Sequence, residues 1–541
     1  MSGWTHVVVG AGAAGAVLAA RLSEAPETRV LLLEAGGESR APWFTVPMMT
    51  ALLMRPGGSW NWSFKAEPSP GLDNRPSDFP RGRALGGSTA INGMVHVRGL
   101  PSDYDAWAQA GLPGWSWERV RPLFLRTEDF RGPGGLPEEH GTGGPLRVSR
   151  RPRPVSPLAE AYVEAGIAAG YPACTDFNGP APEGFGWYHL ANRDGRREST
   201  ASAFLRPART RPNLTVLTGA EVLRVVVEHG AARGVEIAHR GRTRVLRAEA
   251  EVILSAGVIG SPKLLMLSGI GPAEPLHALG LPVIAEAPEV GRNLHDHVLI
   301  RVQHAAREGA GLHYLSQPHR AALAFAQAAL LGTGPMSVFP LEAGAYVRSP
   351  GADLPDLQSH FLPALASAAM RFNPFAPPPP GAGPGFMANM SVMRPRSRGT
   401  VELASADPRV PPVIRPNLLA DRHDLERLID GAEILREVFA QRPFDRWRGA
   451  ELNPGPDLRT RAELEPWVRR TANTVYHPVG ACRMGADPTS VVDGALRVRG
   501  VSGLRVADAS VFPAIPSANT AAPSMMAGEK AADLILGRTP D

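Results

Sequence analysis

Cysteine and long hydrophobic runs are scarce in this 541-residue chain. Cys174 and Cys482 lie far apart and form no C-x-x-C motif, which excludes a disulfide framework and a zinc module and fits a reducing cytoplasm. The best apolar candidate for a membrane span, residues 321–331, is shorter than the roughly 18 residues required and contains Gln327. We therefore expect a soluble, cytoplasmic protein with no transmembrane segment.

Lysine is also scarce, because the chain has three lysines against 54 arginines. The formal net charge of +5 could suggest a nucleic-acid partner. The arginines, however, are scattered among acidic residues and form none of the basic runs that are typical of nucleic-acid binding. We therefore expect no nucleic-acid partner.

Glycine and proline are abundant, with 58 and 54 residues. In a disordered chain such a content would accompany few apolar residues, but 43% of this chain is hydrophobic. The length predicts two or three packed units with ample core. The composition indicates a folded, loop-rich enzyme.

The N-terminus carries a glycine pattern between a strand and a helix. A predicted strand at 6–9 leads into Gly10, Gly12 and Gly15, and a helix is predicted at 16–22. Gly10 permits a tight turn, Gly12 lets a pyrophosphate approach the backbone, and Gly15 lets the helix pack closely on the strand. The free N–H groups at the helix N-terminus attract phosphate.

An acidic residue follows the second predicted strand, 29–33, at the distance that this pattern requires. Glu34 is placed to accept hydrogen bonds from an adenosine ribose, so the unit predicts dinucleotide binding. The next segment, 34–37, separates FAD from NAD only weakly. A series of short alternating strands, expected to form a β-meander ahead of a buried strand at 251–255, favours flavin. These strands are predicted at 215–217, 222–227, 234–239 and 243–247.

The chain as a whole predicts an α/β fold, α+β overall. We expect a Rossmann-like FAD-binding domain with the inserted β-meander, formed by residues 1–155, 200–300 and 470–541. Residues 156–199 and 301–469 would form a substrate-binding domain with a mixed or antiparallel sheet flanked by helices.

Five segments, taken in order, resemble the glucose-methanol-choline (GMC) oxidoreductase family over essentially the whole chain. They are VVVGAGAAGAVLAARL near the start, PRGRALGGSTAINGM at 80–94, SAGVIGSPKLLMLSGIGP at 255–272, VGRNLHDH at 290–297, and the C-terminal VYHPVGACRMG with DASVFPAIPSANTAAPSMMAGEKAADLI. Within the family the chain looks most like the choline-dehydrogenase-type alcohol dehydrogenases. The resemblance implies FAD as cofactor and oxidation of a primary alcohol to an aldehyde by hydride transfer to flavin N5.

The resemblance and the glycine pattern together give the expected cofactor-binding residues. These are Gly10, Gly12, Ala13, Ala14, Gly15, Glu34, Ala35, Arg83, Gly86, Gly87, Ser88, Asn92, Gly93, Met94, Val95, Val222, Ala256, Gly257, Asp508, Ala509, Asn519 and Thr520. Some members attach FAD covalently through a histidine in the segment that starts at Gly86. Here Ile91 stands at that position, so we expect non-covalent FAD.

The catalytic residues are expected near the C-terminus. Removing the hydroxyl proton of an alcohol requires a base, and His477 matches the active-site histidine of the family. A second position facing the hydroxyl is histidine in some members and asparagine in others. In this chain it is Asn519.

The expected substrate contacts are Trp62, Glu342 and Tyr476. Glu342 falls where choline-oxidising members place a carboxylate that faces the trimethylammonium group. Such a cation normally also needs aromatic walls, which Trp62 and Tyr476 could supply but Pro340 and Leu341 do not. We therefore favour a less polar alcohol and keep choline as an alternative.

The triplet His295-Asp296-His297 is interpreted as a structural loop, because no nearby spacing supplies further metal ligands, and no metal is expected. Electrons would pass to a quinone or dye-type acceptor. The alternatives are an oxidase of the same fold that uses oxygen on aryl alcohols or hydroxymethylfurfural-like compounds, and a lyase that keeps FAD structurally. A homodimer is left open.

Overall fold

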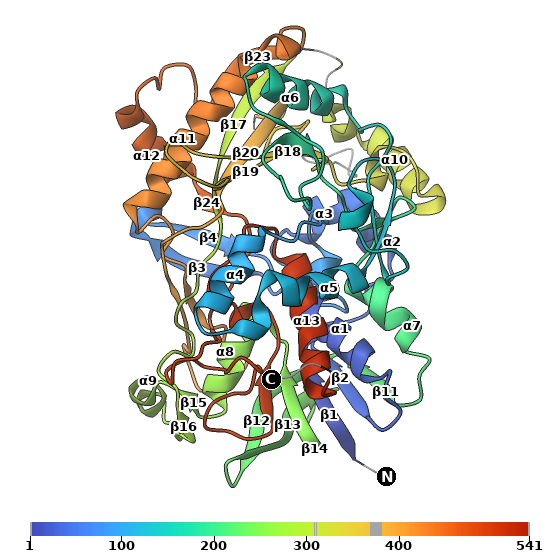
Figure 1. Cartoon of the computed structure of the whole chain (residues 1–541), viewed down its shortest axis with the longest axis vertical. Coiled ribbons are helices and arrows are strands. Elements are labelled where there is room, and N and C mark those ends of the chain that lie inside the picture. The colour runs from blue at the N-terminus through green and yellow to red at the C-terminus, as the bar shows by residue number, and fades with distance from the viewer. Residues whose placement is uncertain (1–2, 308, 310, 368–380, 539–541) are drawn as a thin grey trace.

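The computed structural model describes residues 3–307, 309, 311–367 and 381–538. Two large sheets lie one above the other along the long axis, with the first and last parts of the chain in the lower half (Figure 1). The predicted α/β fold is confirmed. The limits of the two predicted domains stay a prediction.

The lower sheet is built on a parallel core. The strands β1 (Trp4–Val9), β2 (Val30–Glu34), β11 (Leu214–Thr218) and β25 (Leu504–Val506) run parallel to their neighbours, in the order β11-β2-β1-β14 with β25 beside β14. β2 is buried along its whole length. A run such as Val-Leu-Leu-Leu is typical of a strand covered on both faces.

The predicted β-meander is present, but two of its strands differ from the prediction. β12 (Ala220–Glu228) and β13 (Ala231–His239) pair antiparallel with each other and with β14 (Arg242–Leu254). β14 is one long strand that pairs with β13 in its first half and with β1 in its second, so the predicted strands 243–247 and 251–255 are continuous. The strand predicted at 215–217 belongs to the parallel core, as β11, and not to the meander.

The first helix packs into the first sheet through its glycines. Helix α1 (Ala13–Leu22) follows β1 directly, and a Cβ atom on Gly15 would lie 2.0 Å from the carbonyl oxygen of Gly10. A larger residue at 15 would therefore push the helix off the strand. The C-terminal helix α13 (Ala521–Ile535) packs against α1, where Gly528 allows close approach to Ala14. The two ends of the chain thus meet in one core.

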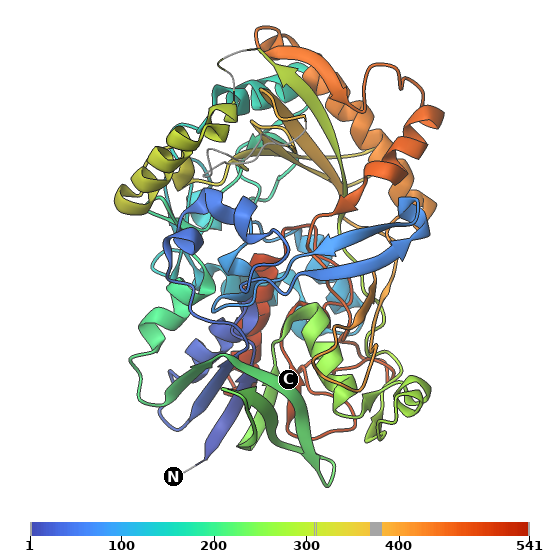
Figure 2. The ribbon, with the colours of Figure 1, turned by 180° about the vertical axis from the view of Figure 1, so that it is seen from behind.

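The upper sheet is antiparallel apart from its last pair, β7 and β8 (Figure 2). Its order is β23 (Arg448–Asn453), β17 (Val298–Ala306), β20 (Gly385–Val392), β19 (Leu357–Leu362), β18 (Ala343–Val347), β8 (Gly184–Trp187) and β7 (Ala173–Cys174), with β24 (Asn473–Thr474) also beside β17.

Side chains alternate between the two faces of this sheet. One face packs Ile300, Phe361 and Ala388 against helices α6 (Pro157–Ala168), α11 (Arg422–Phe439) and α12 (Arg461–Thr471). Burying each large apolar side chain contributes roughly 1.5–3 kcal/mol. Neighbouring residues of the same strands therefore point to the other face, toward the lower sheet.

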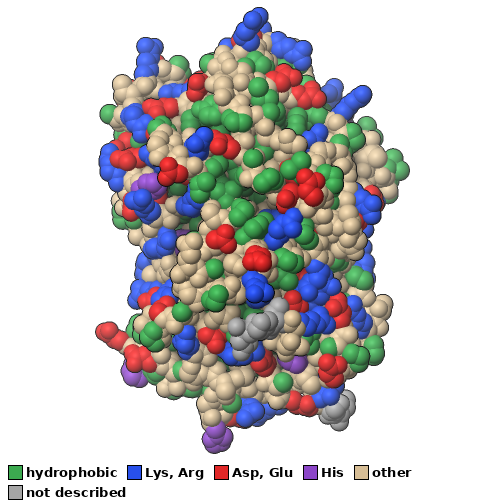
Figure 3. Space-filling model, viewed as in Figure 1, with side chains coloured by type: hydrophobic (Ala, Val, Ile, Leu, Met, Phe, Trp, Pro, Cys, Tyr) green, Lys and Arg blue, Asp and Glu red, His purple; other side chains and the backbone are tan. Residues whose placement is uncertain are grey.

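On the face shown in Figure 3, acidic and basic side chains are interspersed. Many arginines pair with nearby acids, as Arg224 does with Glu236 and Arg422 with Glu426. Among the described residues, none of the helices combines the length and the apolar composition that a bilayer crossing requires.

Candidate active site

A cavity of about 450 Å³ lies between the two sheets. Its lining comes from segments far apart in sequence: the glycine turn after β1, the end of β2, residues 80–95, the start of α8 (Gly257–Leu267), the second face of the upper sheet, and the C-terminal residues 475–478 and 508–524. The glycine turn, residues 80–95, the start of α8 and the C-terminal residues belong to segments that carried the family resemblance, whereas the end of β2 and the upper sheet do not.

One end of the cavity is suited to a dinucleotide. Helix α1 begins at Gly12 with no side-chain cap, so the N–H groups of its first turn remain available to a phosphate. Glu34 is buried, and its carboxylate accepts hydrogen bonds from the N–H groups of Ala11, at 3.0 Å, and Gly36, at 2.8 Å. Burial raises the pKa of Glu34 to about 7. The two bonds hold the carboxylate at the tip of β2, where it can accept further hydrogen bonds from a ribose.

The second glycine segment packs directly on the first. A Cβ atom on Gly87 would lie 2.7 Å from the Cα atom of Gly12. Gly86 and Gly87 both have positive φ, as does Met94 at the end of the segment. The backbone of 87–95 thereby lies along the cavity wall, which fits a flat ring system pressed against it.

Most predicted site residues line this one cavity, and four do not. The lining includes Gly10, Gly12, Ala13, Ala14, Glu34, Ala35, Trp62, Gly87, Ser88, Asn92, Gly93, Met94, Val95, Val222, Ala256, Gly257, Tyr476, His477, Asp508, Ala509, Asn519 and Thr520. Gly15 and Gly86 shape the cavity wall without lining it. Gly15 lets helix α1 pack on the turn at Gly10, and Gly86 takes the positive φ of the turn before Gly87. Arg83 lies beside the cavity, with its guanidinium 4.8 Å from the Trp62 ring centre and 3.4 Å from Glu221.

The fourth residue, Glu342, was predicted to face the substrate, but its side chain does not line the cavity. Its neighbours Phe339 and Leu341 line the wall, whereas the Glu342 carboxylate is buried on the other side and accepts a hydrogen bond of 2.8 Å from the N–H group of Val155. Adjacent residues entering a strand point in opposite directions, which separates Leu341 from Glu342. Burial raises the pKa of Glu342 to about 7.

His477 and Asn519 are brought together at the other end of the cavity. The amide nitrogen of Asn519 lies 3.2 Å from Nε2 of His477 and 3.3 Å from Nε2 of His360. The amide oxygen accepts a hydrogen bond of 3.0 Å from the amide nitrogen of Gln358. The amide therefore directs its two N–H groups at two imidazoles.

A chain of hydrogen bonds sets the tautomer of His477. The carbonyl oxygen of Met393 can only accept, so Nε2 of His297, 2.9 Å away, carries a proton. Burial lowers the pKa of His297 to about 4, so this ring is neutral and its Nδ1 accepts from Nδ1 of His477 across 3.1 Å. Nε2 of His477 is then left unprotonated, and its lone pair accepts a hydrogen bond from the Asn519 amide.

Desolvation inside the cavity, together with the neighbouring His297, His360 and Arg81, holds the pKa of the partly buried His477 well below the usual range of histidine. The ring is accordingly neutral at pH 7. A neutral imidazole with Nε2 unprotonated is the form that can take a proton from a hydroxyl group.

The triplet at 295–297 was predicted to be only a structural loop, but two of its side chains bind His477. Asp296 accepts a hydrogen bond of 2.8 Å from the backbone N–H of His477 and another from the Thr474 hydroxyl. His297 holds the imidazole itself. The loop therefore positions His477, which sequence reasoning missed because the two segments lie 180 residues apart.

The upper sheet supplies polar residues that were not predicted. His360, Asn389 and Arg301 stand side by side on β19, β20 and β17 and line the cavity. The side-chain oxygen of Asn389 is buried without a hydrogen-bond partner in the described structure. The Arg301 guanidinium, whose pKa burial lowers, forms no hydrogen bond or ion pair with the residues described. Apolar side chains surround them: Leu299, Phe339, Leu341, Leu362 and Met387.

A second group of histidines and acids is buried outside this cavity. His140 lies 2.9 Å from Glu128 and 2.8 Å from Asp176, and these carboxylates raise its pKa to about 9. His189 completes the only set of three clustered potential metal ligands among the described residues. Because both nitrogens of His140 donate to carboxylates, neither offers a lone pair to a metal ion.

The fold and the cavity define the class, which is that of a dinucleotide-binding oxidoreductase. The comparisons agree, since the sequence profile described as GMC oxidoreductase matches residues 4–299 for its N-terminal part and 395–528 for its C-terminal part. The chain belongs to the GMC oxidoreductase family, binds FAD and acts on CH–OH donors.

Relatives match over nearly the whole chain. It is 43% identical to the oxygen-dependent choline dehydrogenase of Sinorhizobium medicae and 42% identical to that of Brucella ovis, in each case over 99% of this chain and 96% of the relative. Among solved structures it is similar to pyridoxine 4-oxidase from Mesorbium loti, with a TM-score of 0.87, 34% identity, and 99% and 100% of the two chains covered. It is also similar to formate oxidase from Aspergillus oryzae RIB40, with a TM-score of 0.91, 27% identity and coverage of 99% and 98%.

Proposed function

We propose that the protein oxidises a primary alcohol to the aldehyde, with His477 as the base. The observation that carries this proposal is the neutral imidazole of His477, whose unprotonated Nε2 faces the cavity beside the Asn519 amide. Bound FAD supplies the hydride acceptor, at its N5 atom. The residues that would hold it are the α1 N-terminus, Glu34 and the backbone of 87–95.

His477 takes the hydroxyl proton onto Nε2. The electron pair left on oxygen then helps to expel hydride from the adjacent carbon, so the alcohol loses a proton and a hydride and becomes the carbonyl. General-base catalysis of this kind contributes about 10²–10⁴-fold in rate. The hydrogen bonds that His477 donates to His297 and Asp296 hold the ring in one tautomer and one orientation, so the base needs no rearrangement before it acts.

Asn519 holds the substrate oxygen next to the base. Its amide nitrogen donates toward Nε2 of His477, which is the place that a hydroxyl group would take. An amide does not compete for the proton at neutral pH, so it orients the alcohol without acting as a second base. The Gln358 hydrogen bond prevents the amide from turning its oxygen toward the imidazole.

The substrate end of the cavity does not favour a cation. The carboxylates in the lining are Glu34, Glu221 and Asp508, which belong to the lower sheet and its adjoining loops. The guanidinium groups in the lining are those of Arg81, beside His477 and partly offset by the buried Asp296, and of Arg301, beside Tyr476. A trimethylammonium group would therefore find positive charge where it needs negative charge. We propose an alcohol other than choline, with an apolar body and an acceptor group, such as a carboxylate, for Arg301.

The electron acceptor stays a prediction. We propose a quinone or dye-type acceptor, and oxygen is the alternative, which the similarity to oxygen-dependent choline dehydrogenases supports. Comparing anaerobic dye reduction with peroxide release during turnover separates the two.

The central experiment follows loss of the flavin absorbance under nitrogen after mixing with a panel of primary alcohols. At least one alcohol should bleach the flavin, and His477→Ala should slow bleaching by about 10²-fold or more while FAD stays bound. His277→Gln, on the short helix α9 (Ala273–Ala278), is the matched control and should behave as wild type. If no alcohol bleaches the flavin, the lyase alternative gains and the proposal fails. Near-normal bleaching in His477→Ala would remove His477 from the role of base.

A further inference from the structure

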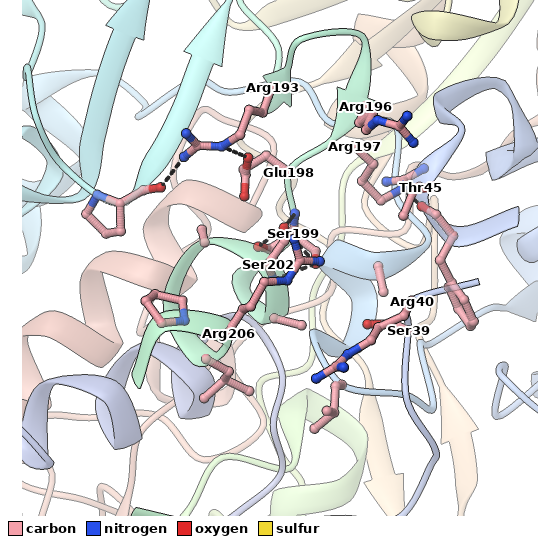
Figure 4. A pocket seen from close by; sticks show the side chains of 18 of the residues that line it. Ser39, Arg40, Thr45, Arg193, Arg196, Arg197, Glu198, Ser199, Ser202 and Arg206 are labelled. Carbon is pink, nitrogen blue, oxygen red and sulfur yellow. Dashed lines mark hydrogen bonds and ion pairs between the residues drawn. The ribbon is translucent and has the colours of Figure 1, made fainter. Parts of the chain in front are cut away.

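A second cavity, of about 410 Å³, lies beside the first one. It is formed by residues 38–45 after β2 and by residues 193–209, which contain β10 (Arg196–Arg197), the π-helix η6 (Ala201–Leu205) and α7 (Arg206–Ala208) (Figure 4). Six arginines line it: Arg40, Arg193, Arg196, Arg197, Arg206 and Arg209. So many guanidinium groups around one hollow need an explanation, because like charges repel one another.

The acidic residues of this cavity are already neutralised. Glu198 pairs with Arg193 at 2.5 Å. Glu38 pairs with Arg209 at 2.7 Å and with Arg40 at 3.2 Å. The third acid, Asp129, pairs with two arginines that do not line the cavity, Arg147 at 2.9 Å and Arg131 at 3.1 Å. The lining acids therefore leave no negative charge for the remaining arginines.

Three arginines of the lining, Arg196, Arg197 and Arg206, have no carboxylate partner among the residues that the structure describes. Arg206 forms no hydrogen bond or ion pair within that part of the chain, and Arg196 makes one long hydrogen bond of 3.4 Å to the carbonyl oxygen of Leu330. A concave site with several uncompensated cations concentrates positive potential and attracts anions.

Arg197 is the buried member of the three, with 5% of its surface exposed. It donates to the carbonyl oxygens of Phe44, at 3.1 Å, and Asn92, at 2.6 Å, and to the Thr50 hydroxyl. These acceptors carry no formal charge, so the cation is solvated by dipoles alone, and burial lowers its pKa to about 9. Asn92 and Thr50 also line the flavin cavity, so Arg197 forms part of the wall between the two cavities.

We propose that this second cavity binds a ligand through a phosphate dianion, either free or as an ester of a small molecule. Guanidinium groups recognise phosphate through paired N–H donors, which Arg196 and Arg206 can supply. The charge of Arg197 adds to theirs, although its N–H groups already donate to the protein, so the site suits a dianion better than a monocarboxylate. The Ser199 hydroxyl lies among the arginine side chains and adds a further donor, whereas the Ser202 hydroxyl already donates to the Ser199 carbonyl oxygen (Figure 4). The volume falls in the range of metabolite-binding sites. This cavity shares no lining residue with the flavin cavity, so the phosphate proposal can be tested independently of the proposed oxidation.

The test is calorimetric titration of the FAD-loaded enzyme in 0.15 M salt, where the bound cofactor already fills the dinucleotide site. Inorganic phosphate and glycerol 3-phosphate are titrated separately, so that free and esterified phosphate are distinguished. At least one should bind with 1:1 stoichiometry. The double variant Arg196→Gln/Arg206→Gln should weaken that binding by about 10-fold or more, because each removed cation would contact a charged group.

The control is Arg242→Gln/Arg244→Gln, which removes two exposed arginines of β14 that have no partner in the described structure. It changes net charge equally and should leave the affinity unchanged. Unchanged flavin absorbance in both variants confirms that the fold and cofactor are intact. No binding of either phosphate compound to the wild type, or equal weakening in both double variants, overturns the proposal.

Discussion

Asn519 donates from its amide nitrogen to Nε2 of His477 across 3.2 Å, so the proposed base faces a group that cannot take its proton. The opposite arrangement, with an acceptor facing Nε2, would draw a proton onto that nitrogen. Whether the side-chain atom of residue 519 that faces Nε2 is a donor or an acceptor therefore decides whether Nε2 of His477 is unprotonated, as a base requires, or protonated.

Asn519→Asp tests this relationship through the pH profile. In the wild type the pKa of His477 is lowered, so the rate of anaerobic flavin reduction should stay level from pH 6.5 upward and fall only below the ordinary histidine range. A carboxylate at 519 raises the pKa of His477, because it favours the charged imidazolium. The variant should be slowed at least about 10-fold at pH 7 and should recover as the pH rises.

Asn74→Asp adds the same charge in an exposed turn and serves as the control. If the rate of Asn519→Asp begins to fall at the same low pH as in the wild type, the amide does not set the protonation of His477.

Arg301→Met tests the substrate class. The unpaired guanidinium should bind the acceptor group of the alcohol, so 4-(hydroxymethyl)benzoate should have a lower KM than benzyl alcohol in the wild type. The variant should raise KM for the acid by about 10–100-fold, the value of a hydrogen bond to a charged group, and change benzyl alcohol little. Arg292→Met, at an exposed ion pair with Glu402, should leave both values unchanged. Choline that is oxidised as efficiently as the best neutral alcohol would contradict the assignment.

Ile91 bears on how FAD is held. Its side chain is buried at the cavity wall and has no nucleophilic atom, so FAD should come away when the protein is denatured. Acid precipitation should leave the yellow colour in the supernatant and a colourless pellet. Ile91→His is the informative partner variant, because it restores the residue type of the covalently linked members. Wild-type protein that keeps its colour after denaturation and washing would refute non-covalent binding.

His140 predicts a pH dependence of stability. Its folded-state pKa of about 9 exceeds the ordinary value of 6.5, so the folded state holds the proton more tightly. The resulting stability is fully present below pH 6.5 and is lost as the pH rises toward 9. The thermal midpoint of the wild type should fall over this window, and His140→Gln, although less stable at pH 6.5, should show a smaller fall. Parallel curves for the two proteins would show that His140 does not titrate there.

Local sequence patterns were enough for the dinucleotide unit. The turn after β1, helix α1 and Glu34 lie within about thirty consecutive residues, so the positions of the glycines report directly on a compact β-α-β structure. The meander was less well predicted, because β14 continues without a turn from an antiparallel into a parallel pairing. The first part of β14 is largely exposed and its last part is buried, so the hydropathy changes along the strand. In the sequence, this change resembles a boundary between two strands.

The sequence by itself determined the family, the cofactor and the choice of His477 and Asn519 as predicted catalytic residues, because each is carried by a contiguous motif. Only the tertiary structure decided that His297 and Asp296 hold His477, that Arg301 and Asn389 face the same cavity, and that Glu342 faces away from it. These facts depend on strand register and on which face of a sheet a side chain occupies. A shift of a single residue reverses that face, and no spacing along the chain records it.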